Sequence, residues 1–144
     1  MTSNALPQDT LHLVDRYVAL WNEADTAARR RVIGELWAEE GTHVLEPPAA
    51  MRAEAAALGF PSPELEVRGF AELEFRVARA YDEFVGSGRF TFRSRGDGAR
   101  LGRVVKFHWE MMPTDGGPIA AVGLEILVLD GRGRILADHQ FIEA

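Results

Sequence analysis

The first half of the chain places its hydrophobic residues at helical spacing. Three such stretches predict helices over residues 9–23, 26–38 and 70–85, and the alanine-rich segment 49–58 predicts a fourth. Asp9 can cap the first helix, Gly41 can end the second, and "THVLEPP" predicts a short strand closed by prolines. The inward stripes of the three periodic helices are Leu11, Val14, Val18 and Trp21; Val32, Ile33, Leu36 and Trp37; and Phe70, Leu73, Val77, Tyr81 and Phe84.

The second half changes to strand patterns. Strands are predicted over residues 90–95, 103–112, 118–130 and 134–143, separated by the turn sequences "GDG", "TDGG" and "DGRG". Two of these strands exceed the usual length, so the sheet is expected to bend strongly, with Gly123 as a candidate bend. Helices followed by a meander predict an α+β fold. In it, N-terminal helices pack on a strongly bent antiparallel sheet and leave a cavity between the two layers.

Composition narrows the function classes. The chain has 144 residues, 47% hydrophobic and 26% charged, which suits one soluble domain over residues 1–144. The net charge of −6 argues against nucleic-acid binding, which needs a basic face. No membrane span or secretory signal is visible, so we expect no membrane partner and a cytoplasmic location. The absence of cysteine excludes disulfides, thiolate metal sites and a cysteine nucleophile.

Metal and phosphate sites are not expected. The histidines are His12, His43, His108 and His139, and no two have the spacing of a metal-ligand pair. The glycine-rich turns lie between predicted strands rather than before helices, and no serine lies in a nucleophile elbow. The sequence therefore predicts neither a metal nor a cofactor.

The stretch "VVKFHWEMM" alternates two sets of residues that would lie on opposite faces of a strand. Lys106, His108 and Glu110 form one set, in which an imidazole beside a carboxylate could be a catalytic pair. Three ionisable groups in a row are also typical of a solvated face or a dimer interface, and we favour that interpretation. The opposite set contains Val105, Phe107, Trp109 and Met111. Of these, Phe107, Trp109 and Met111 are candidates for ligand binding, because their face of the strand would line the cavity.

Polar residues on other elements are the better candidates for chemistry. His43 and Glu46 lie at the end of the first predicted strand, where polar side chains can meet a ligand at a pocket mouth. Glu125 interrupts the apolar run "VGLEILVL", so it is either a base with a raised pKa or an outward residue paired with Arg103 or Lys106. Tyr81 lies on a buried helical stripe, where it is either a simple core tyrosine, the interpretation we favour, or a residue whose hydroxyl reaches the cavity.

The stretch "RYVALWNEADTAARRRVIGELWAEEGTHV" resembles the SnoaL-like branch of the nuclear-transport-factor-two-like superfamily. The matching features are the pair Trp21 and Asn22, the acidic break, the arginine-rich second helix, and a first strand ending in Glu46 and Pro47. Later matches are "VVKFHWEM", "VGLEILVLDGRGRI" and the closing "FIE". The resemblance covers most of the chain, and residues 48–67 look like an inserted helical segment.

This resemblance implies a cone-shaped α+β fold with a deep pocket for a small hydrophobic ligand, and homodimers formed through the outer sheet face. It does not imply a single activity. Relatives include ketosteroid isomerases, limonene epoxide hydrolases, scytalone dehydratases and polyketide cyclases, alongside binding and scaffold domains.

The last strand departs from the family pattern. Limonene epoxide hydrolase-like members have a catalytic Asp at the position of Gln140, which cannot act as a base; Asp138, on the same face, could take that role. Two inward sets remain open for this strand. Hydrophobicity alone favours Ile135, Ala137 and Phe141, together with His139. The family pattern, which we follow, favours Leu136, Asp138, Gln140 and Ile142.

Two hypotheses follow for the function. The first is a cofactor-free isomerase, cyclase or hydrolase that acts on a hydrophobic carbonyl-bearing ligand by general acid/base chemistry. Glu125 or Asp138 would be the base, His43 or Tyr81 the hydrogen-bond donor, and the 49–58 helix a lid. The second hypothesis is a non-enzymatic dimeric binding or accessory domain.

Overall fold

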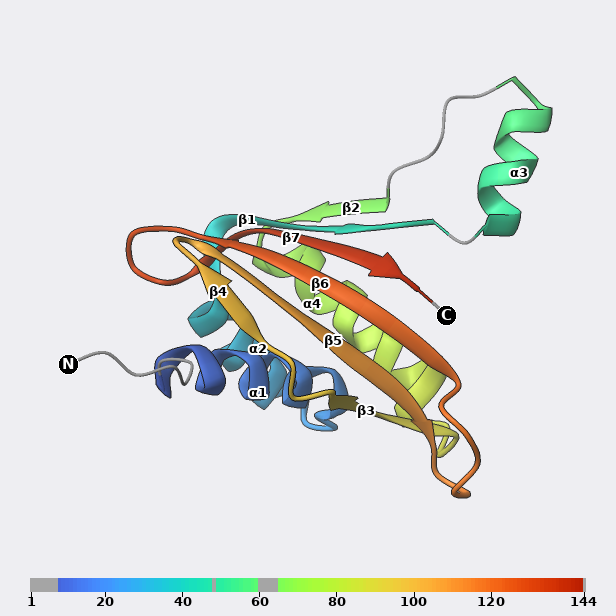
Figure 1. The fold of residues 1–144 in the computed structure, drawn as a ribbon, viewed down its shortest axis with the longest axis horizontal. Coiled ribbons are helices and arrows are strands. Elements are labelled where there is room, and N and C mark those ends of the chain that lie inside the picture. The colour runs from blue at the N-terminus through green and yellow to red at the C-terminus, as the bar shows by residue number, and fades with distance from the viewer. Residues whose placement is uncertain (1–7, 48, 60–64, 144) are drawn as a thin grey trace.

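The computed structural model describes residues 8–47, 49–59 and 65–143. The chain folds into helices that cover one side of a long, bent sheet, as Figure 1 shows. The elements are α1 (Gln8–Asn22), α2 (Thr26–Leu36), β1 (Trp37–Leu45), α3 (Ala49–Ala57), β2 (Leu65–Arg68), α4 (Phe70–Ala80) with a π-helical turn at Tyr81–Val85, β3 (Phe90–Ser94), β4 (Ala99–Leu101), β5 (Val104–Pro113), β6 (Ala121–Leu129) and β7 (Ile135–Ile142). The predicted α+β class is confirmed.

The sheet is mixed rather than wholly antiparallel, which corrects the sequence-based expectation. Its strand order is β2-β1-β7-β6-β5-β3, and β4 pairs with β5. The meander β5-β6-β7 is antiparallel, but β7 pairs with β1 in parallel. The sequence pattern around β1 could not show this pairing, because β1 ends at Leu45 and β7 begins only at Ile135.

The second helix ends earlier than predicted, because Trp37 begins β1. Gly41 lies within that strand, at an irregularity between the pairs Trp37–Ile135 and Thr42–Ala137. A Cβ at Gly41 would lie 2.7 Å from the Ile135 carbonyl oxygen and from the Trp37 ring. Gly41 therefore permits a close approach of backbones inside the sheet, rather than ending a helix.

The segment predicted as an insertion, residues 48–67, contains the helix α3 and most of the strand β2. Helix α3 is exposed and stands away from the body of the protein in Figure 1. Residues 48 and 60–64 lie outside the described residues. β2, at the end of the segment, was not predicted as a strand, but it pairs with β1 and belongs to the sheet. Only four residues long, β2 is too short for periodicity to identify.

The charged set on β5 faces outward, as the alternation indicated. Glu110 accepts hydrogen bonds from Nε of Arg93 and of Arg95 at 2.8 and 2.9 Å, and these bonds lower its pKa. His108 lies between two other carboxylates, 2.5 Å from Asp97 and 2.7 Å from Glu143. His108 and Glu110 are therefore bound to different partners on the outer face, and they do not form a catalytic pair.

A bulge explains the conflict between the two inward sets proposed for β7. Ile135 pairs with Leu129 and Ala137 with Val128, so Leu136 has no partner in the register. Ile135 is fully buried, whereas Leu136 is 43% exposed, so the prediction that Leu136 points into the cavity is wrong. Beyond the bulge the inward residues are Asp138, Gln140 and Ile142, as the family pattern predicted.

The core lies between the helices and the inner face of the sheet. It contains Val14 and Leu20 from α1, Ile33 from α2, and Leu73 and Val77 from α4, and these pack toward β5 and β6. None of the described helices has the length and apolar character needed to cross a membrane.

Candidate functional site

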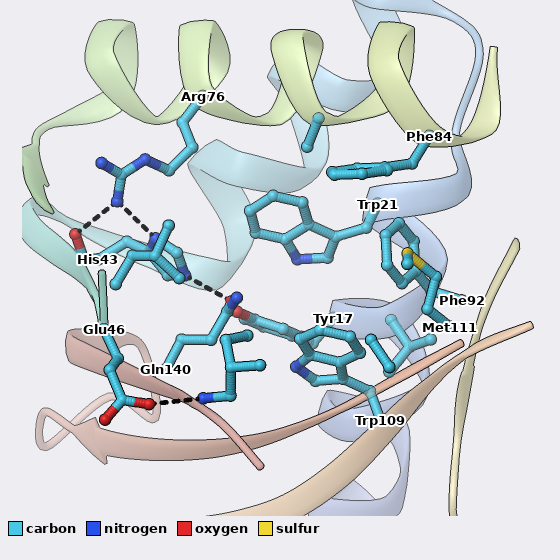
Figure 2. Close-up of a pocket in the computed structure, with 15 residues that line it drawn as sticks. Tyr17, Trp21, His43, Glu46, Arg76, Phe84, Phe92, Trp109, Met111 and Gln140 are labelled. Carbon is cyan, nitrogen blue, oxygen red and sulfur yellow. Dashed lines mark hydrogen bonds between the residues drawn. The ribbon is translucent and has the colours of Figure 1, made fainter. Parts of the chain in front are cut away.

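A cavity of about 310 Å³ lies between α1, α4 and the inner face of the sheet. Figure 2 shows its lining side chains. The apolar part contains four aromatic rings, those of Trp21, Phe84, Phe92 and Trp109, together with Met111; the polar part contains Tyr17, His43, Glu46, Arg76 and Gln140. The remaining lining residues are Val18, Leu45, Ala80, Ala121 and Ile142. A mostly apolar cavity with a few grouped polar side chains is typical of a small-molecule site.

Trp109 has its place in the cavity wall because β6 has no side chain opposite it. It pairs with Gly123, where an added Cβ would overlap atoms Cε2 and Cζ2 of the indole. Phe92 of β3 packs edge-on against the same indole, with ring centroids 5.5 Å apart. From this position, Trp109 Nε1 donates a hydrogen bond of 2.8 Å to Oε1 of Glu125.

Beside the cavity, two fully buried carboxyl groups share one tyrosine hydroxyl. The Tyr17 hydroxyl lies 2.6 Å from Oδ2 of Asp138 and 3.0 Å from Oε2 of Glu125. Tyr17 is 1% exposed, and both acidic residues are completely buried. The residues come from α1, β6 and β7, so only the tertiary fold brings them together.

The number of protons in this cluster follows from its geometry. A tyrosine hydroxyl has one hydrogen, so it can donate to only one of the two carboxyl groups. Burial and the charge of Asp138 raise the pKa of Glu125 well above its ordinary value, although the bonds from Trp109 and Tyr17 act in the opposite direction. Burial, Asp138 and Glu125 likewise raise the pKa of Tyr17. These pKa directions favour a protonated Glu125 and a neutral Tyr17.

His43 connects this cluster to the cavity mouth. Its Nε2 lies 3.1 Å from Oε1 of Gln140 and 3.8 Å from Oδ2 of Asp138, and its Nδ1 lies 2.9 Å from NH1 of Arg76. Burial lowers the pKa of His43; Arg76 lowers it further, whereas Asp138 and the bond to Gln140 raise it. The net direction favours a neutral imidazole.

No family model and no curated protein matches the sequence. The solved structures do give a match. A candidate isomerase of the SnoaL-like family from Agrobacterium tumefaciens superimposes with a TM-score of 0.75 and 24% identity, over 96% of this chain and 100% of that one. The chain has the NTF2-like fold of SnoaL-like proteins.

Other NTF2-like structures agree with this assignment of the fold. A protein of unknown function from Mesorhizobium loti has a TM-score of 0.62 and 16% identity, covering 99% of this chain and 98% of that one. A candidate SnoaL-like polyketide cyclase from Jannaschia sp. has a TM-score of 0.55 and 12% identity, covering 98% and 92%. At these identities the likeness concerns the fold, and the chemistry depends on the site itself.

The NTF2-like fold distributes the sequence-predicted site residues over three places. His43, Glu46, Trp109, Met111 and Gln140 line the cavity. The candidate bases Glu125 and Asp138 do not line it; they lie behind the wall, hydrogen-bonded to lining residues. The interpretation of Glu125 as an outward residue is wrong, because its side chain is completely buried.

Two predicted ligand contacts, Phe107 and Tyr81, are corrected, since neither lines the cavity. Phe107 is a core residue 1% exposed, with its ring 5.3 Å from the ring of Tyr17. The strand alternation placed Phe107 on the inner face, but it could not show that the Tyr17 ring lies beside it there. Tyr81 lies in the π-helical turn, where the guanidinium of Arg29 sits 5.1 Å from its ring centroid. Helix α3, the predicted lid, contributes no lining residue either.

Sequence reasoning missed Tyr17, Trp21 and Arg76 as lining residues. Tyr17 lies three residues after Val14 and four before Trp21, so it extends the inward stripe of α1, and that spacing could have identified it. Arg76 gave no signal, because a charged helical residue is usually solvated. Its role depends on β1 lying beside α4.

Ligand atoms of His43, Glu125 and Asp138 lie within 4.8 Å of one another, so by residue type they could hold a metal ion. The sequence spacing could not show this set, because its members come from β1, β6 and β7. A cation there would require the proton of Glu125 to leave and the Tyr17 hydroxyl to withdraw from between the carboxyl groups. The existing hydrogen bonds therefore fit a proton-sharing cluster better than a ligand shell.

Proposed function

We propose that this NTF2-like protein binds a small hydrophobic, carbonyl-bearing molecule in the cavity and transfers a proton on it without a cofactor, as an isomerase, cyclase or hydrolase. One observation carries the proposal. An apolar cavity borders Tyr17, and the Tyr17 hydroxyl contacts two buried carboxyl groups, those of Glu125 and Asp138. Similar folds described as an isomerase and a polyketide cyclase agree with this class of chemistry.

The cluster can both give and take a proton. When Tyr17 donates its proton to a ligand oxygen, the protonated Glu125 can replace it; when Tyr17 accepts one, its own proton can pass to Asp138. Asp138 Oδ1 is buried without a hydrogen-bond partner among the described residues, which leaves it available as a base. Glu125→Gln and Asp138→Asn would each abolish turnover of a substrate while binding survives, and full activity in both would reject these roles.

Ligand binding in the cavity is the first prediction. Ala121 lines the cavity and pairs with Met111 of its apolar part, so the larger side chain of Ala121→Phe would occupy ligand space there. Hydrophobic ketones such as 2-acetylnaphthalene are expected to raise the melting temperature of the wild type. At a ligand concentration of a hundred times Kd, binding adds about 2.7 kcal/mol to the free energy of unfolding. The control is Ala57→Phe on the exposed helix α3, which should respond like the wild type.

Thermal-shift titrations of the three proteins make this comparison. The ketone should leave the melting temperature of Ala121→Phe unchanged. An equal shift in Ala121→Phe would place the ligand elsewhere. No shift in the wild type with any ketone of a broad panel would count against the ligand class.

A non-enzymatic binding or accessory domain is the second candidate. Its support is that Gln140 stands where hydrolase-like relatives have an Asp, and that neither buried carboxyl group lines the cavity. Tight binding of a ketone, together with no chemical change of it over long incubation, would favour this candidate.

A homodimer through the outer sheet face is proposed for either function. That face has apolar side chains between its charged groups, and they include Leu124, Ile126, Val128, Leu136 and Phe141. Phe141 and Leu136, both on β7, are each 43% exposed, and apolar side chains gathered on one surface often mark an interface. Sedimentation equilibrium should give twice the mass of 15.9 kDa for the wild type and the single mass for Phe141→Glu. A monomeric wild type would contradict the dimer.

A further inference from the structure

Three side chains from three elements form a chain of hydrogen bonds that ends at the cavity, as Figure 2 shows. Arg76 of α4 places NH1 2.9 Å from Nδ1 of His43, and Nε2 of His43 lies 3.1 Å from Oε1 of Gln140. The same Arg76 nitrogen also contacts the backbone oxygens of His43 and Leu65 at 3.1 and 3.0 Å. These contacts hold the guanidinium against β1.

Arg76 sets the direction of every hydrogen bond in this chain. A guanidinium can only donate, so Nδ1 of His43 must accept and carries no proton. The proton of a neutral imidazole is then on Nε2, which donates to the Gln140 oxygen. The amide nitrogen of Gln140 must therefore point away from His43. Among the described residues this nitrogen has no hydrogen-bond partner, and Gln140 lines the cavity.

A second lining residue also presents an unpaired donor. Trp21 lines the cavity, and its Nε1 is buried with no hydrogen-bond partner among the residues that the structure describes. Buried N–H groups are nearly always paired in proteins, because an unpaired one loses its bond to water without replacement. The buried Trp21 N–H is therefore an unsatisfied donor, and the Gln140 amide is a second donor among the residues that line the cavity.

We propose that Arg76 and His43 are positioning residues that hold the Gln140 amide with its N–H groups toward the cavity, so that the cavity selects ligands carrying a hydrogen-bond-accepting oxygen. Ketones and enolates have such an oxygen, whereas hydrocarbons of the same shape do not. This inference rests on the proposed function, because it names the ligand class of the same cavity. It also gives Gln140 a role that a base cannot fill, as a donor to the oxygen on which negative charge develops.

The tautomer of His43 tests the positioning role without any ligand. Long-range ¹H–¹⁵N NMR spectra of the histidine rings should show the Nε2–H form in the wild type and in Arg76→Lys, whose ammonium is also only a donor. Arg76→Met should allow the Nδ1–H form to appear. An Nδ1–H form in the wild type would overturn the inference, even if Arg76→Met does not fold. An unchanged spectrum in folded Arg76→Met would also overturn the inference.

A pair of probes tests the selectivity. 2-Acetylnaphthalene and 2-ethylnaphthalene have similar shapes, but only the first has an acceptor oxygen. By calorimetric titration, the ratio of their Kd values should shift against the ketone by about fivefold in Gln140→Met, which keeps the length of the side chain and removes the amide. Arg76→Lys should keep the wild-type ratio.

Comparing ratios between variants removes the difference in hydration between the two probes. The same ratio in the wild type and in Gln140→Met would overturn the selectivity while leaving ligand binding intact. Failure of both probes to bind the wild type, together with no thermal shift from any ketone of the panel, would instead overturn the proposed function, and the NMR result would then decide the positioning role by itself.

Discussion

Tyr17→Phe is expected to destabilise the protein by about 3 kcal/mol at pH 7, the largest effect we predict for the loss of a single atom. The hydroxyl donates to Asp138 at 2.6 Å and also contacts Glu125, and all three side chains are buried. Without it, Asp138 loses its donor at 2.6 Å, and Nε2 of His43 lies farther away, at 3.8 Å from Oδ2. Leaving a buried charge without its donor costs several kcal/mol, whereas losing a neutral hydrogen bond costs about 1 kcal/mol.

Tyr81→Phe is the matched control, because the chain has only two tyrosines. The Tyr81 ring contacts Arg29, and the substitution keeps the ring. Urea unfolding of both variants at pH 7 measures the two changes, and Tyr81→Phe should stay within about 0.5 kcal/mol of the wild type. Equal stabilities of the two variants would mean that the Tyr17 hydroxyl does not hold a charged carboxylate.

Gly123→Ala is expected to destabilise the protein by about 1–3 kcal/mol, although alanine is a small residue. The added Cβ would overlap the six-membered ring of Trp109, so the indole must move. That movement breaks the 2.8 Å hydrogen bond from Trp109 to Glu125 and changes the shape of the cavity. Urea unfolding measures the loss of stability, and near-ultraviolet circular dichroism should report the altered packing of the indole.

Gly34→Ala in α2 is the control for this substitution. Nothing lies within 4 Å of a Cβ at Gly34, and its backbone is helical, so alanine should stabilise the protein by about 0.5–1 kcal/mol. Opposite signs are therefore predicted for the same chemical change at two positions. A neutral or stabilising Gly123→Ala would contradict the close packing of Trp109 over β6.

Periodicity predicted much of the fold, because the long elements bury a continuous face. The stripe of α1 and the alternation of β5 each reflect one buried side, and the structure confirms the α+β class that they indicated. The parallel pairing of β1 with β7 and the bulge at Leu136 were beyond this reasoning. Both depend on contacts between distant segments, which no local pattern contains.

The sequence identified only some residues of the candidate site. Glu125 stood out because a charge within an apolar strand needs a partner, and Asp138 stood out only through the family resemblance of the last strand. Their partner, Tyr17, lies more than a hundred residues away, and the sequence could not show that it joins the two carboxyl groups. Arg76 likewise looked like an ordinary helical surface residue until the fold placed it against Nδ1 of His43.

The protonation of Glu125 also links stability to pH. Because burial and Asp138 raise its pKa in the folded state, its stabilising contribution is complete below the pKa of the unfolded chain. That contribution is lost as the pH rises toward and through the raised folded value. Glu125→Gln keeps a neutral side chain, so its stability should fall less than that of the wild type between pH 5 and pH 8.

A ¹³C NMR titration of the side-chain carboxyl groups tests most directly whether the cluster beside the cavity holds a shared proton. Loss of one signal in Glu125→Gln would assign the resonance. Glu125 should lose its proton at a pH well above the value of about 4.3 for an ordinary glutamate. Titration of Glu125 at that ordinary value would contradict the proton-sharing cluster and the acid/base chemistry proposed from it.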